Sequence, residues 1–194
     1  MSIDGVEIVS GAANIVLANT DIEISELDLP GYTTGTWACS DVSGLTTGLP
    51  TAGVATGEIF QIEPGSDVRC EITNDDIAPQ LTLTKTLIND NGGLKTIADF
   101  DVSVDGVEIV NGAVNTVLAN TDIEISELDL DGYTEGAWSC VDGSGLTSGL
   151  PTAGTATSEI FQLAPGADVN CSIVNDDLAP VSYTHLTLPT ILRV

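Results

Sequence analysis

The chain has 194 residues, of which 29 are Asp or Glu and only 4 are Lys or Arg, so its formal net charge at pH 7 is -25. Proteins that bind nucleic acid or anionic membranes neutralise phosphate groups with Lys and Arg, and this composition excludes both kinds of partner. Hydrophobic residues nevertheless make up 42% of the chain, and the mean hydropathy is +0.25. The chain is therefore too apolar for a disordered acidic tail and predicts folded domains with cores of Val, Ile, Leu and Ala.

An internal repeat with an offset of 101 residues organises the chain. The segment that begins at Ile3 matches the segment that begins at Val104, without a gap, over the rest of the first copy. Two copies this similar must share one fold, and the period is that of a domain rather than of a solenoid unit. Residues 81–103 have almost no counterpart in the first copy. We therefore predict a truncated domain over 1–79, which lacks its first strand and most of its second, and a complete domain over 80–180.

Within each copy, apolar and polar residues alternate with a period of two, which is typical of strands with one buried face. In the second copy the clearest alternating segments are 81–87, 123–127 and 169–175. Sequences that favour turns separate the predicted strands, at 89–93, 104–106, 130–133 and 163–168. No segment has a sustained helical period. The pattern predicts an all-β chain of two tandem β-sandwich domains, Ig-like, with Greek-key connections.

The last segment, 181–194, differs in composition from the rest, because it contains the only His and no acidic residue. Its sequence VSYTHLTLPT resembles the translated read-through of an adapter used to build sequencing libraries. We therefore expect a non-native or disordered tail and leave it out of the fold prediction. The alternative is the first strand of a third copy, since PVSYTHLTL is loosely similar to PQLTLTKTL.

Three polar residues, Lys85, Glu127 and Asn175, occupy positions where the alternation requires an apolar side chain. They lie on three different predicted strands, and one buried cluster explains them better than three separate unpaired groups, because burying an unpaired charge is costly. Burial favours a neutral amine and a protonated carboxyl group. Such an amine can attack the Asn carboxamide while the Glu moves the proton, which gives a Lys–Asn isopeptide crosslink. The alternative is that each is a solvated residue at a strand end or turn.

The second copy resembles the Cna B-type, SpaA-like prealbumin-fold repeats of bacterial surface proteins, and the first copy resembles them in part. LTLTK ending at Lys85, IEISELDLDGY with Glu127, and CSIVNDD with Asn175 carry the resemblance. It implies a prealbumin-like sandwich that serves as a stalk module in adhesins or pilins, with an autocatalytic crosslink between these residues. The first copy has Glu26 and Asn74 at the matching positions but no lysine, so it cannot form the bond by itself.

The four cysteines, Cys39, Cys70, Cys140 and Cys171, permit three pairings into two disulfides. Their spacing is identical in the two copies, which predicts the disulfides Cys39–Cys70 and Cys140–Cys171. Closing a loop of this size stabilises a small domain by about 3 to 4 kcal/mol and implies an oxidising location outside the cytoplasm. The alternative is a pair of buried reduced thiols in each copy. Such a pair of cysteines is not typical of the crosslinked Gram-positive members and offers a second kind of covalent link.

Acidic and amide residues gather at the predicted domain ends, at Asp75, Asp76, 89–91, Asp176 and Asp177. Their oxygens are the ligands that Ca²⁺ prefers, but the spacing matches no EF-hand loop, and a solvated acidic surface is the simpler interpretation. No other cofactor or metal is expected.

No phosphate-binding loop, dinucleotide fingerprint, HExxH motif or nucleophile elbow occurs in the sequence. We therefore predict no enzyme activity beyond the autocatalytic crosslink. The predicted function is that of a structural stalk or spacer in an exported bacterial surface protein, located outside the cell or on its surface, with neighbouring repeats as its partners. The alternative is an adhesive module that binds a glycan or a host or matrix protein through its loops.

Overall fold

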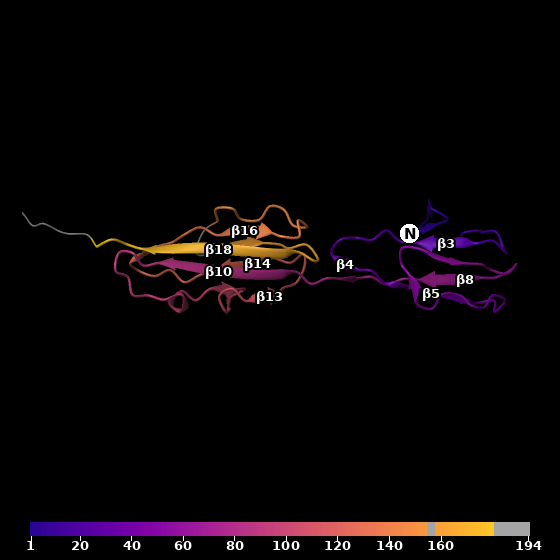
Figure 1. Ribbon diagram of the computed structural model, residues 1–194, viewed down its shortest axis with the longest axis horizontal. Coiled ribbons are helices and arrows are strands. Elements are labelled where there is room, and N and C mark those ends of the chain that lie inside the picture. Colours follow the sequence, from indigo (N-terminus) through magenta and orange to yellow (C-terminus); the bar gives the residue numbers. More distant parts are fainter. Residues whose placement is uncertain (155–157, 181–194) are drawn as a thin grey trace, which may run out of the picture.

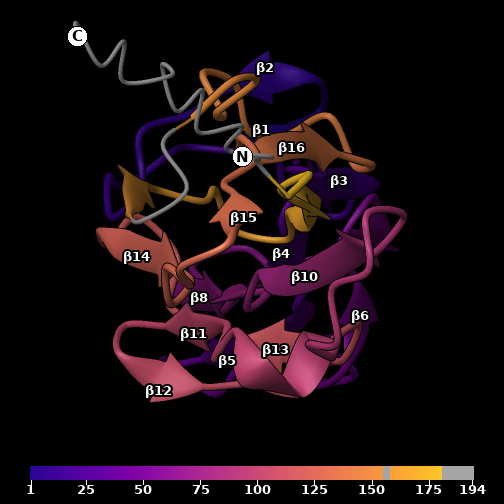
Figure 2. The same ribbon diagram turned by 90° about the vertical axis from the view of Figure 1, so that its left-hand side faces the viewer.

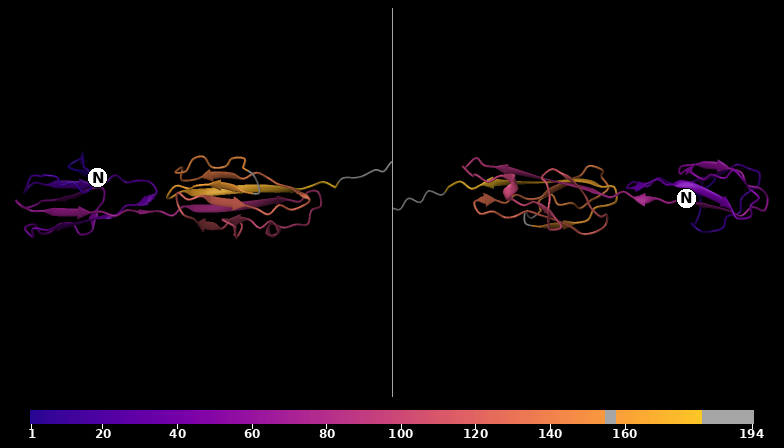
Figure 3. Two further views of the ribbon diagram at one scale, coloured as in Figure 1. Left: turned by 180° about the vertical axis from the view of Figure 1, so that it is seen from behind. Right: turned by 90° about the horizontal axis from the view of Figure 1, so that it is seen from below.

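The computed structural model describes residues 1–154 and 158–180, and the predicted non-native tail at 181–194 lies outside the described residues. Within these ranges the chain is all-β apart from one 3-10 turn, η1 (Ile97–Asp99). Two sandwiches, repeat 1 (1–79) and repeat 2 (80–180), lie end to end along the long axis (Figures 1 and 3). Figure 2 looks along this axis, so that one repeat lies behind the other. No helix in the described ranges is long and apolar enough to cross a membrane.

Repeat 2 is a sandwich of two sheets. Its strands are β10 (Gln80–Ile88), β11 (Ser103–Val104), β12 (Val107–Glu108), β13 (Val114–Thr116), β14 (Ile123–Ser126), β15 (Tyr133–Thr134), β16 (Ser139–Asp142), β17 (Glu159–Phe161) and β18 (Asp168–Asp177). One sheet has the order β13-β10-β18-β15, with β16 also paired to β18, and the other has the order β12-β11-β14-β17. The predicted sandwich of strands is confirmed.

The first and last strands of repeat 2, β10 and β18, are parallel neighbours over nine register pairs, and Figure 1 shows them side by side. Every second residue of both strands points into the core, as the alternation predicts. The inward side chains of Leu81, Leu83 and Val169 are completely buried, and they pack with Ile123 and Ile125 of the facing sheet. Because side chains alternate between the two faces of a strand, β10 and β18 each present one apolar face to the core of the sandwich.

Repeat 1 follows the chain path that repeat 2 takes from β11 onward. Its strands are β1 (Ser2–Ile3), β2 (Val6–Glu7), β3 (Ile22–Ser25), β4 (Tyr32–Thr33), β5 (Thr36–Asp41), β6 (Gly53–Val54), β7 (Glu58–Phe60), β8 (Val68–Glu71) and β9 (Asp75–Asp76). They form the sheets β2-β1-β3-β7, β6-β5-β8 and β4-β9. Among the described residues of repeat 1, no strand corresponds to β10 or β13, and two short strands, β8 and β9, stand where repeat 2 has the long β18.

The segment between the repeats is hydrogen-bonded on both sides. Ile77 N–H donates to Gly31 O of repeat 1 at 2.9 Å, and Ile77 O accepts from Gly166 N–H of repeat 2 at 2.6 Å. Two residues later, Pro79 O accepts from Val117 N–H at 3.1 Å. The connection is therefore part of the folded structure rather than a free linker.

Candidate crosslink site

Three strands of repeat 2 bring Lys85, Glu127 and Asn175 together in the core. Lys85 Nζ donates to Glu127 Oε2 at 2.5 Å, and Asn175 Nδ2 donates to Glu127 Oε1 at 2.8 Å. The three residues are 1%, 6% and 1% exposed. One carboxylate thus holds the amine and the carboxamide at its two oxygens, and the three predicted site residues form a single buried cluster.

The pairing of β10 with β18 places the amine and the carboxamide on the same face. Lys85 lies opposite Ile173, and Leu87 lies opposite Asn175, so the two site residues are two positions apart in the parallel register. Residues two apart point to the same side of a sheet. Glu127 directly follows β14 and reaches them from the facing sheet.

The Lys85 amine is buried beside an aromatic ring. Burial lowers the pKa of Lys85, and the hydrogen bond and negative charge of Glu127 offset only part of that shift. The ring of Phe100, itself 0% exposed, lies 4.4 Å from Nζ, measured to the ring centroid. A lowered pKa makes the neutral, nucleophilic amine more accessible near neutral pH than it is for a solvated lysine.

The carboxamide oxygen has its own donor. Asn175 Oδ1 accepts a hydrogen bond from the backbone N–H of Gly136 at 3.0 Å. Only glycine fits at this position, because a Cβ there would lie 2.0 Å from Val174 O. A backbone N–H aimed at a carbonyl oxygen polarises it and stabilises the negative charge that develops when a nucleophile attacks the carbon.

Sequence reasoning missed both Phe100 and Gly136. Glycine at the matching positions 35 and 136 of the two copies was a usable signal for the backbone donor. Phe100 lies in the segment without a counterpart in the first copy, so the repeat comparison offered no signal for it.

Repeat 1 contains the same site without the lysine. Asn74 Nδ2 donates to the Glu26 carboxylate, and Gly35 N–H donates to Asn74 Oδ1 at 2.9 Å. Asn74 is exposed and Glu26 is only half-buried, in contrast to their buried counterparts in repeat 2. The carboxylate, carboxamide and backbone donor are thus arranged alike in the two repeats.

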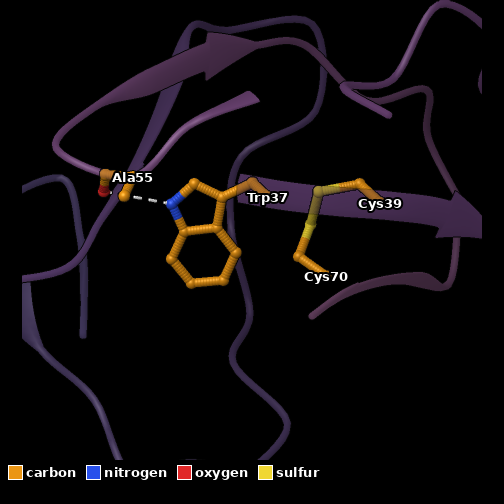
Figure 4. The surroundings of a disulfide bond; sticks show 4 residues. All are labelled: Trp37, Cys39, Ala55 and Cys70. Atoms are coloured by element: carbon orange, nitrogen blue, oxygen red, sulfur yellow. Dashed lines mark hydrogen bonds between the residues drawn. A yellow bond between two sulfur atoms is a disulfide. The ribbon is translucent and has the colours of Figure 1, made fainter. Parts of the chain in front are cut away.

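The structure brings the cysteines together in the predicted pairs. Cys39 and Cys70 form a disulfide with an S–S distance of 2.04 Å, and Cys140 and Cys171 form one of 1.99 Å. Each joins directly opposite residues of antiparallel strands, β5 with β8 and β16 with β18. Figure 4 shows the indole of Trp37 beside the first disulfide, where its Nε1–H donates to a backbone carbonyl oxygen at 3.2 Å. Each disulfide therefore fixes the register between the two antiparallel strands that it joins.

The acidic residues at the end of repeat 2 form one cluster, in which one oxygen each of Asp90, Asp176 and Asp177 lies within 4.8 Å of the others. These three carboxylates are the groups at this end of repeat 2 that could hold a cation. Burial opposes ionisation of Asp177, but hydrogen bonds from the backbone N–H groups of Asn91 and Gly93 outweigh it and lower its pKa. The Asp177 carboxylate thus ties the loop after β10 to the end of β18.

A family model described as a prealbumin-like fold domain matches residues 2–72 and 76–173. Among solved structures, the major pilin protein T3.2 from Streptococcus pyogenes serotype GAS13637 is similar, with 16% sequence identity and a TM-score of 0.36. That similarity covers 81% of this chain and 66% of the length of the pilin chain. No curated protein sequence matches. Because the family match extends over both repeats, this chain belongs to the SpaA-type prealbumin-like fold domain family.

Proposed function

We propose that the chain is a structural stalk or spacer module of an exported bacterial surface protein, located outside the cell or on its surface and stiffened by covalent links inside its repeats. The observation that carries the proposal is the buried Lys85–Glu127–Asn175 cluster between the first and last strands of repeat 2. The two disulfides support an oxidising location. Membership of the prealbumin-like family fits the same interpretation.

The proposed link is an isopeptide bond between Lys85 and Asn175. The neutral Lys85 amine attacks Cγ of Asn175, whose oxygen is held by Gly136 N–H. Glu127 accepts a proton from the attacking nitrogen and passes one to Nδ2. The new bond joins Nζ to Cγ, the bond from Cγ to Nδ2 breaks, and one ammonia molecule leaves, so that atoms and charge balance. We expect no turnover of an external substrate.

The position of this bond explains why it suits a stalk. Tension along the chain enters repeat 2 through the start of β10 and leaves through the end of β18. A bond from Lys85 to Asn175 connects these two parallel strands directly, so the force bypasses residues 86–174. Everything between the two linked residues is then protected from extension.

The first experiment is the intact mass of the full chain under reducing conditions. We expect the mass to be one ammonia below that of the unmodified sequence. Lys85→Met removes the amine while still filling the buried space, and Glu127→Gln removes the proton carrier, so both should restore the full mass. Asn74→Ala in repeat 1 is the matched control and should leave the loss of ammonia unchanged. An unmodified mass for the parent chain would contradict the crosslink.

The second experiment tests the mechanical role by stretching single molecules under reducing conditions. We expect repeat 2 of the parent chain to resist extension, because the bond excludes residues 86–174 from the stretched path. In the Lys85→Met chain the same force should release that whole segment. Equal extensions for the two chains would show that the cluster does not carry tension.

A further inference from the structure

Two Asn-Gly pairs occur in the sequence, Asn91–Gly92 and Asn111–Gly112. In such a pair the backbone nitrogen of the glycine can attack Cγ of the asparagine, because glycine has no side chain to hinder the close approach. The attack closes a five-membered succinimide ring and releases ammonia, and water then opens the ring to aspartate or isoaspartate. In a folded protein the rate depends on how the carboxamide and the glycine nitrogen are held.

The structure holds both reacting groups of the pair Asn111–Gly112. Gly112 N–H donates to Leu83 O of β10 at 2.8 Å, and Asn111 Oδ1 accepts from the backbone N–H of Lys85 at 2.6 Å. Asn111 Nδ2 also donates to Lys85 O at 3.3 Å. Attack by Gly112 N would require the hydrogen bond to Leu83 to break and the carboxamide to turn away from Lys85, so β10 protects this pair.

The pair Asn91–Gly92 lies in the exposed loop that follows β10 and is held differently. Among the described residues, Gly92 N–H and Asn91 Oδ1 have no hydrogen-bond partner. A Cβ on Gly92 would meet no atom within 4 Å, so the space beside its backbone is open. The attacking nitrogen is therefore free to approach the carboxamide without the loss of a bond to a strand.

The leaving group of Asn91 is in contact with a carboxylate. Nδ2 donates to Asp90 Oδ1 at 2.7 Å and to Asp177 O at 2.9 Å. A carboxylate in this position can accept the proton that the attacking nitrogen releases and pass it to Nδ2, which is general acid–base catalysis. The backbone N–H of Asn91 donates to both oxygens of the Asp177 carboxylate, so the residue stays in place while its side chain reacts.

We propose that Asn91–Gly92 is a site of spontaneous deamidation in the folded protein, whereas Asn111–Gly112 is protected. The bond from Gly92 N to Cγ of Asn91 forms, the bond from Cγ to Nδ2 breaks, and the proton of Gly92 N leaves with the ammonia. One water molecule then breaks one of the two imide C–N bonds. Opening at Cγ gives aspartate, opening at the backbone carbonyl carbon gives isoaspartate, and water is the only co-reactant.

The product weakens the attachment of the loop to the end of β18. The two hydrogen bonds that Nδ2 donates are lost, and a new carboxylate joins Asp90, Asp176 and Asp177, whose oxygens already lie within 4.8 Å of one another. Like charges at this distance repel. The isoaspartate form also lengthens the backbone by one atom before Gly93, whose N–H donates to Asp177 Oδ2 at 2.6 Å. Deamidation should therefore loosen this loop.

The test incubates the full oxidised chain in ¹⁸O-labelled water at neutral pH and follows both pairs by peptide mapping. We expect labelled aspartate and isoaspartate to appear at Asn91 at least about tenfold faster than at Asn111. In urea with the disulfides reduced, the two rates should become similar. The label separates this reaction from isopeptide formation at Asn175, which incorporates no water. Equal rates in the folded chain, an unreacted Asn91, or the same ratio of rates in the unfolded chain would overturn the proposal.

Two variants test the geometry of the loop. Gly92→Ala places a methyl group beside the attacking nitrogen and should slow labelling of Asn91 by about tenfold, with Asn111 unchanged. Undiminished labelling would show that this nitrogen is not the nucleophile. Asn91→Asp carries the charge of the product and should speed amide hydrogen exchange at Gly93. Asn120→Asp adds the same charge at another exposed turn and should not. Unchanged exchange in Asn91→Asp would overturn the loosening of the loop.

Discussion

The carboxylate of Asp142 holds together the loop that follows β16. Its oxygens accept hydrogen bonds from the backbone N–H groups of Ser144, Thr147 and Asp168, at 2.8, 2.7 and 3.2 Å. Burial opposes ionisation, but these bonds, together with that from the Ser144 hydroxyl, outweigh it and lower the pKa of Asp142 to about 2. Asp41 makes the corresponding bonds in repeat 1, where its pKa also lies well below the usual range. One carboxylate in each repeat therefore fastens this loop to the turn before the last strand.

This geometry predicts how stability depends on acid. The folded pKa of Asp142 lies below the value of about 3.9 for an unfolded Asp, so the folded state binds fewer protons in that window. The stabilisation should be complete above about pH 4 and should disappear as the pH falls towards about 2. We expect Asp142→Asn to lower the stability of repeat 2 at pH 7 and to flatten its decline below pH 4.

Urea unfolding between neutral and acid pH, followed by hydrogen exchange in each repeat, measures the effect. Asp131→Asn, at an exposed turn, is the control and should leave the acid dependence unchanged. A parent chain whose repeat 2 keeps the same stability from pH 5 to below pH 3 would contradict the assignment.

At the level of secondary-structure elements, β10 joins β13 to β18 in the sandwich of repeat 2. The alternation of 81–87, 123–127 and 169–175 was sufficient to predict the strands and the three polar residues at inward positions, because a buried face selects every second side chain. The parallel pairing of β10 with β18 was not predictable in the same way, since it joins segments about 90 residues apart and no local pattern records it. The same holds for the Phe100 ring under Nζ, whereas the glycine shared by positions 35 and 136 was a usable signal for the backbone donor.

Among the described residues of repeat 1, the pairing of β5 with β8 is held by the Cys39–Cys70 disulfide without a neighbouring strand of the β10 type. Removing a native disulfide from a small domain costs about 2 to 5 kcal/mol. The double variant Cys39→Ala, Cys70→Ala should therefore unfold repeat 1 under conditions in which the double variant Cys140→Ala, Cys171→Ala keeps repeat 2 folded. Hydrogen exchange resolved by repeat, at increasing urea concentrations, makes this comparison. Equal unfolding midpoints for the two repeats would show that β10 contributes little to stability.

At the level of the whole molecule, two glycine turns form the joint between the repeats. Gly31 and Gly166 both have positive φ, +87° and +72°, and a Cβ on Gly31 would lie 2.2 Å from Pro165 O. Gly132 occupies the matching turn of repeat 2 with a φ of +91°, and a Cβ there meets no atom of the described residues within 4 Å. The turn at Gly31 therefore contacts the neighbouring repeat, whereas the matching turn at Gly132 has free space around it among the described residues.

This difference provides a matched pair of variants for the rigidity of the joint. Gly31→Ala and Gly132→Ala both force a side chain into the left-handed region, at a cost of about 1 to 2 kcal/mol each. Only Gly31→Ala also collides with the neighbouring repeat, so only this variant should separate the motions of the two sandwiches. ¹⁵N relaxation should show one common tumbling time in the parent chain and in Gly132→Ala, and two shorter times in Gly31→Ala. If Gly31→Ala keeps one common tumbling time, the contact between the repeats does not hold the joint rigid, and the end-to-end arrangement would not transmit bending from one repeat to the next.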